Sequence, residues 1–212
     1  MRPTLCLLVT AVLLTTSCVE RSRGLTRTER EQLRQYVTDT PSSPQHELDI
    51  SFEDKILLIG YDVESETVAA GDTLTVTWPW KVERALEDGW RLFTHVTDER
   101  GGNQLNEDDN GMMRQLYQPG QWKNGEYVRD RQQITIPADW AGQRAVVYMG
   151  NRNGPNRLRV IRGPNDGDNR ARVATFNVGG GAGATAQPNT NDAIDIAIPT
   201  HIGMSSLFAS TR

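Results

Sequence analysis

His95 and Asp130 have the residue types of a catalytic acid–base pair, and both fall in segments with strand-like alternation. His95 is the only one of the three histidines in such a segment, and Asp130 shares an inward face with Val128 and Ile134. A general base needs a partner that orients it, and a buried carboxylate needs a charged or hydrogen-bonding partner. For Asp130, His95 or a backbone turn would serve. A pair with His95 could transfer protons or act as a structural polar clamp. We favour the clamp, because the chain has no G-x-S-x-G motif that would supply a nucleophile.

An acidic loop with the sequence NEDDNG has oxygen-bearing side chains of the kind that bind calcium. Asn106, Asp108 and Asn110 fall at the first, third and fifth positions of an EF-hand loop. The twelfth position requires a bidentate glutamate, but it is Tyr117. We therefore interpret the loop as a solvated turn, keep the three residues as weak calcium candidates, and expect no metal or other cofactor.

The five tryptophans could form aromatic platforms for sugar rings, or they could fill the core. Trp78 continues the alternating face of Leu74 and Val76, so we predict that it is buried. Trp122 and Trp140 lie at loop or strand margins and are the better candidates for surface aromatic residues that bind a ligand.

Short apolar or alternating segments separated by turn signals must position these residues. We expect strands at residues 56–63, 74–78, 90–96, 128–136, 145–149, 158–161 and 173–178. Pro79 should place the end of its strand at a sheet edge or a bulge. About seven short strands with no long internal helix pattern predict an all-β fold, an immunoglobulin-like antiparallel β-sandwich.

One short helix is expected before the strands. Residues 26–29 read T-R-T-E, in which Thr26 can cap the backbone of Glu29 and Glu29 can reach back, as in a capping box. Leu33 and Val37, four residues apart, would share one face of a helix that continues through Val37.

These patterns divide the chain into four parts. Residues 1–17 form a signal peptide, 18–44 a lipid-anchored tether with the short helix, and 45–179 the β-sandwich domain. Residues 180–212 begin with a Gly-rich linker and continue as a polar tail that we expect to be mostly disordered. The alternating isoleucines at 194–198 leave open a single strand in that tail.

The strand region carries a family resemblance. Its pattern is W-K at residues 80–81, F-x-H-x-x-D at 93–98, W-x-x-G-E at 122–126, and then Asp130. Over residues 55–178 the chain resembles the extracytoplasmic β-sandwich domains appended to some polytopic bacterial glycosyltransferases, and lipoproteins of similar build. The resemblance implies a fold. It supplies no catalytic residue and carries no transferase activity over to this chain.

The N-terminus indicates export. Arg2 precedes an apolar run at residues 5–14, which is too short to span a bilayer, and small polar residues lead from it to Cys18. This arrangement resembles the lipobox of bacterial lipoproteins, in which the cysteine is lipidated and becomes the first mature residue. The alternative is an ordinary cleaved signal with an incidental cysteine. By resemblance to the sorting rules of Gram-negative bacteria, Val19 after the cysteine suggests the outer membrane.

Composition further limits the classes of partner that the protein could bind. After loss of the signal, 22 basic and 27 acidic residues leave a net charge of −5, which argues against a nucleic-acid partner. We expect a monomeric, lipid-anchored outer-membrane protein facing the periplasm or the cell exterior. It would act as a non-catalytic binding or scaffold module for an envelope protein or a glycan. A carbohydrate-binding accessory lipoprotein is the first alternative, and an uncharacterised envelope hydrolase the second.

Overall fold

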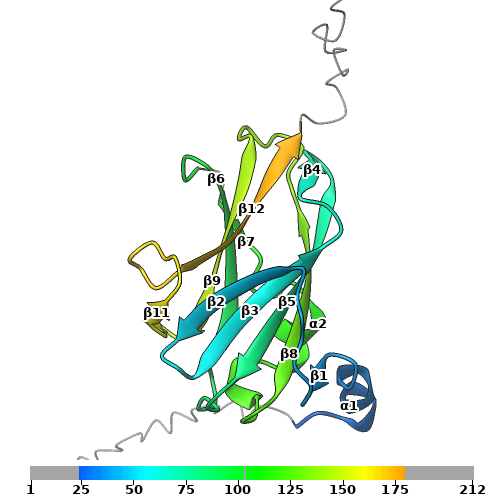
Figure 1. Cartoon of the computed structure of the whole chain (residues 1–212). Coiled ribbons are helices and arrows are strands. Elements are labelled where there is room, and N and C mark those ends of the chain that lie inside the picture. Colours follow the sequence, from blue (N-terminus) through cyan, green and yellow to red (C-terminus); the bar gives the residue numbers. More distant parts are fainter. Residues whose placement is uncertain (1–23, 103, 180–212) are drawn as a thin grey trace, which may run out of the picture.

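The computed structural model describes residues 24–102 and 104–179, which form two packed β-sheets, as predicted (Figure 1). The first sheet has the order β1 (Val37–Thr38), β8 (Tyr127–Thr135), β5 (Thr73–Val82), β3 (Ile56–Val63), β2 (His46–Phe52) and β11 (Val160–Arg162). The second sheet has the order β4 (Thr67–Ala69), β12 (Ala171–Gly179), β9 (Arg144–Asn153), β6 (Arg91–Asp98) and β7 (Leu105–Asn106), and β10 (Asn156–Arg157) also pairs with β9. Two short helices, α1 (Arg27–Leu33) and α2 (Met112–Leu116), and the 3-10 turn η1 (Pro119–Gln121) complete the described elements.

The order of the long strands is that of an immunoglobulin-like sandwich. Strands β3, β5 and β8 are neighbours in the first sheet, and β6, β9 and β12 are neighbours in the second. The chain therefore crosses between the sheets after β5, returns at β8 and crosses again at β9. All these neighbours are antiparallel, whereas the short β4 runs parallel to β12.

Seven strands in the described part have seven or more residues, in agreement with the predicted number. Their positions differ at two points. Strand β2 was not predicted, because its first residues alternate with charged side chains and only residues 50–52 are fully buried. The strand expected at 158–161 is the three-residue edge strand β11, which begins at Val160.

Pro79 lies inside β5, which has neighbours on both sides. Leu58 pairs with Trp80 and Asp62 pairs with Thr77, so β3 carries one more residue than β5 between these two pairs. Proline has no N–H to donate to the ladder, and a bulge is one of the few places where a sheet tolerates it. A sheet edge and a bulge were the two predicted alternatives, and the structure shows the bulge.

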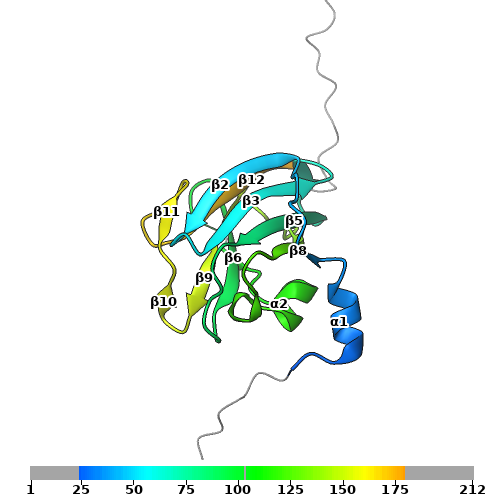
Figure 2. The same ribbon diagram turned by 60° about the horizontal axis from the view of Figure 1, so that its bottom comes forward.

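Helix α1 begins with the predicted capping box. The amide N–H of Glu29 donates to Thr26 Oγ1 at 3.2 Å, and the amide N–H of Thr26 donates to Glu29 Oε2 at 2.7 Å. The helix ends at Leu33, and the expected continuation through Val37 is wrong because Val37 pairs with Val128 in β8. Leu33 is buried in the core, so this part of the predicted tether packs on the sandwich (Figure 2).

Aromatic and aliphatic side chains fill the space between the sheets, and burial of this apolar surface is the main stabilising contribution. Trp78 is fully buried, as predicted, and so is Trp80. The ring of Trp80 contacts Phe52, with centroids 5.8 Å apart, and Trp122, with centroids 6.1 Å apart. Within the described ranges, no helix has the length and hydropathy needed to cross a membrane.

Candidate functional site

Asp130 lies on the inward face of β8, as its alternation predicts, and its side chain is fully buried. Its partner is Arg114 of α2, whose Nε and Nη2 donate to Asp130 Oδ2 at 3.0 and 2.9 Å. The predicted pair with His95 is wrong. His95 alternates with the core residues Leu92 and Val96 and therefore lies on the outer face of β6, whereas Asp130 points between the sheets.

The Arg114–Asp130 pair belongs to a buried polar network that links both sheets. Arg114 Nη2 donates to Gln132 Oε1 at 3.1 Å, and Thr94 Oγ1 of β6 donates to the same oxygen at 3.1 Å. Gln132 Nε2 in turn donates to the backbone oxygens of Glu107 and Asn110, at 2.9 and 3.1 Å. This geometry fits a structural polar clamp, with an arginine in the place predicted for the histidine.

Burial shapes the electrostatics of this clamp. Loss of hydration raises the pKa of Asp130, although the charge and hydrogen bonds of Arg114 act in the opposite direction. Asp130 Oδ1 and Arg114 Nη1 are buried without a hydrogen-bond partner in the described part of the chain. The carboxylate is closed off from solvent, so a substrate has no access to it.

His95 faces outward but is largely covered, with 14% of its side chain exposed. Its Nε2 lies 3.9 Å from Asp108 Oδ1, and its ring centroid lies 5.1 Å from that of Phe93. Burial lowers the pKa of His95, because removing water disfavours the charged imidazolium. The Asp108 carboxylate opposes this effect, and the guanidinium groups of Arg170, Arg157 and Arg152 add to it.

The arginines around His95 belong to a cluster on the outer face of the second sheet, which we call the arginine face. Its members are Arg91, Arg152, Arg157, Arg170 and Arg172.

The register of the strands arranges this face in rows. Arg152 of β9 is directly opposite Arg91 of β6 on one side and Arg157 of β10 on the other, so three arginines form one row. Figure 2 shows β10 beside β9, the two strands that carry Arg157 and Arg152. Toward the start of β9, Gly150 lies two residues before Arg152 and is opposite Phe93. Tyr148 lies two residues before Gly150 and is opposite His95 on one side and Arg172 on the other.

Two aromatic rings hold arginines in place on this face. The Arg157 guanidinium carbon lies 5.1 Å from the centre of the Phe93 ring, and that of Arg170 lies 5.1 Å from the centre of the Tyr148 ring. The Phe93 ring needs the space left by Gly150, where an added Cβ would lie 2.5 Å from Phe93 Cζ.

Asp108 and Asp166 pair with arginines of this face. Asp108 Oδ2 accepts from Arg152 Nη2 at 3.3 Å, and Asp166 Oδ2 accepts from Arg170 Nε at 2.5 Å. Hydrogen bonding to Arg170 and to backbone amides holds the pKa of Asp166 below its usual range, against the effect of burial. The face therefore carries more arginines than paired carboxylates, on a chain whose net charge is negative.

The side-chain oxygens of the three weak calcium candidates accept hydrogen bonds from other groups of the protein. Asp108 Oδ1 accepts the amide N–H of Thr94 at 3.1 Å, and its other oxygen is taken by Arg152. The side-chain oxygen of Asn106 accepts from Gln104, while Asn110 hydrogen-bonds to the backbone of Gln133. In residues 24–102 and 104–179, no three His, Cys, Asp or Glu side chains are grouped as metal ligands.

The two tryptophans proposed as ligand-binding candidates are buried, and that prediction is wrong. Trp122 is 2% exposed, and its Nε1 donates to the backbone oxygen of Tyr117 at 2.8 Å. Trp140 is 8% exposed, and its Nε1 donates to the backbone oxygen of Arg144 at 3.3 Å. Neither ring is presented as a platform for a sugar.

Sequence reasoning missed Arg114 and the arginine face. The available signal for the arginine face was the two-residue spacing along the strands. It places Arg91, Phe93 and His95 on one face of β6, and Tyr148 and Arg152 on one face of β9. Cys18 lies outside the described residues. Searches against protein-family models and against curated proteins find no match for this chain.

Proposed function

We propose that the protein is a non-catalytic binding module of the bacterial cell envelope, held at the outer membrane by lipid on Cys18. Its binding surface would be the arginine face. The observation that supports this proposal is the row of Arg91, Arg152 and Arg157, which lie directly opposite one another on three strands. Like charges in such positions destabilise a sheet, so their presence favours a binding role over a structural one. Arginine and tyrosine are also enriched in the energetically important parts of interfaces.

The surroundings of the two acid–base candidates favour binding over catalysis. Asp130 is sealed between the sheets by Arg114. Phe93, Asp108 and Tyr148 lie beside His95, and three arginines act on its charge. None of these groups is an activated nucleophile. Burial of Trp122 and Trp140 removes the aromatic platforms on which a role in binding neutral sugars would rest.

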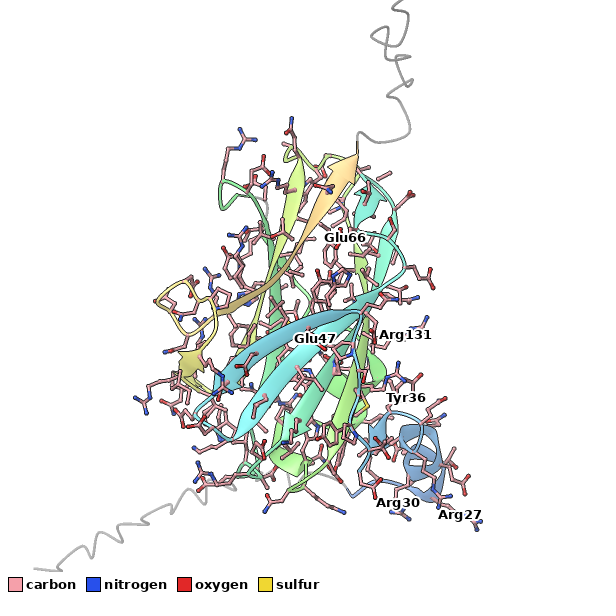
Figure 3. The ribbon with its side chains drawn as sticks, viewed as in Figure 1. Arg27, Arg30, Tyr36, Glu47, Glu66 and Arg131 are labelled. Atoms are coloured by element: carbon pink, nitrogen blue, oxygen red, sulfur yellow. The ribbon has the colours of Figure 1, made fainter. Side chains whose placement is uncertain are left out.

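Site-specific photocrosslinking in cells tests the proposal. A photoreactive amino acid replaces Arg172 on the arginine face, and a control places it at Arg131, an exposed position of β8 in the first sheet (Figure 3). We expect a discrete adduct from position 172 that disappears when Arg152 and Arg157 are both changed to serine. Adducts of equal yield from both positions, or none from position 172, would contradict the proposal.

A further inference from the structure

We infer that the arginine face binds phosphate groups of its ligand, with Arg91, Arg152 and Arg157 as the central donors. This inference rests on the proposed function and specifies the chemistry that the binding surface recognises. Neighbouring strands lie about 4.8 Å apart, so side chains in register on adjacent strands can contact the same small ligand. Each of these three arginines is directly opposite another arginine across a strand pair.

The number of arginines in one row favours phosphate over carboxylate. A single arginine can pair with both oxygens of a planar carboxylate through two parallel hydrogen bonds. A phosphate presents three strong acceptor oxygens and up to two negative charges, so it can receive several guanidinium groups at once. Two neighbouring arginines of the row would share one such group, and their mutual repulsion would become attraction to a common partner.

Two arginines of this face, Arg157 and Arg172, are held in position before any ligand arrives. Arg157 stacks on Phe93, and its Nη1 donates to the backbone oxygen of Asp168 at 2.8 Å. Arg172 Nη2 donates to Thr175 Oγ1 at 3.2 Å. A guanidinium has five N–H donors, so these contacts leave others for a ligand. Part of the entropy cost of ordering these long side chains has therefore been met in the free protein, which favours binding.

His95 would report on the bound group. The charged and titratable groups that face it are Asp108, Tyr148 of β9, and the three arginines 152, 157 and 170, from β9, β10 and the loop before β12. The arginines disfavour the imidazolium, and a phosphate bound among them would cancel that effect. Binding should therefore raise the pKa of His95.

The test uses the full chain in micelles of an uncharged detergent. The imidazole of His95 is followed by NMR across pH during titration with inorganic phosphate, with sodium chloride at equal ionic strength as the reference. We expect a saturable upward shift of the His95 pKa that chloride does not produce. The variant with Arg152→Ser and Arg157→Ser should bind phosphate about tenfold more weakly or worse, because charge-assisted hydrogen bonds are lost. The control Arg131→Ser should respond like the wild type.

Two further arms identify the source of the phosphate and its selectivity. Micelles doped with phosphatidylglycerol, compared with phosphatidylcholine, test a lipid headgroup, while the soluble titration tests a free or glycan phosphate. A response in either arm supports the inference and assigns its source. Equal responses to phosphate, acetate and chloride, or an unchanged response in the double variant, would overturn it. If the phosphate response is absent but adducts from position 172 persist, the binding function stands and only the ligand chemistry fails.

Discussion

Removal of one member of the Arg114–Asp130 pair should be among the most damaging single changes to the sandwich. Both side chains are 0% exposed, and Arg114 makes two hydrogen bonds to Asp130 and one to Gln132. A single replacement leaves the remaining charge buried without its partner, which costs about 3–5 kcal/mol. Domains of this kind have total stabilities of about 5–15 kcal/mol, so Arg114→Met or Asp130→Asn should remove a large share of it.

A double-mutant cycle in urea measures this effect. Tryptophan fluorescence follows unfolding, because Trp78, Trp80 and Trp122 are buried in the folded state. The double variant should be more stable than the sum of the two single losses predicts, since removal of both charges leaves none unpaired.

The control for this cycle is Arg129→Met, a neighbouring arginine on β8. Its side chain is 50% exposed and its Nη2 lies 4.0 Å from Asp62 Oδ2. A half-exposed pair of this kind contributes about 1 kcal/mol or less. Single losses at Arg114 and Asp130 that are no larger than this, or losses that add without coupling, would refute the reasoning.

Three further predictions concern other parts of the chain. Because burial lowers the pKa of His95, the imidazole binds a proton more tightly in the unfolded chain than in the folded protein. The contribution of neutral His95 to folding stability is therefore complete above the pKa of the unfolded chain, about 6.5, and is lost as pH falls toward the folded pKa. His95→Gln should therefore flatten the pH dependence of the melting temperature between pH 7 and 5, and an unchanged slope would contradict this. Gly150→Ala should cost about 1–3 kcal/mol in urea unfolding, because its Cβ would push the Phe93 ring away; an unaltered midpoint would show that the ring moves freely. Mass spectrometry of the mature N-terminus should find two or three acyl chains on Cys18, and a free cysteine or cleavage elsewhere would end that prediction.

Features that depend on neighbours along the chain could be predicted from the sequence. Alternation placed Trp78 and Asp130 on inward faces, because successive residues of a strand point to opposite sides. The spacing of Thr26 and Glu29 predicted the capping box, because both of its hydrogen bonds close within one turn. Six of the seven long strands, all except β2, follow from the same local patterns of apolar residues and turns.

Partners across the fold could not be predicted in this way. Arg114 lies on the five-residue helix α2, and only the packing of α2 against β8 brings it to Asp130. Trp122 lies in a loop segment that folds back over the core, so its burial depends on Trp80 as a neighbour in space. The row of Arg91, Arg152 and Arg157 exists because β9 pairs in register with both β6 and β10. A shift of one residue would turn these side chains to the opposite face, so the arginine face is decided by strand register, which only the tertiary structure contains.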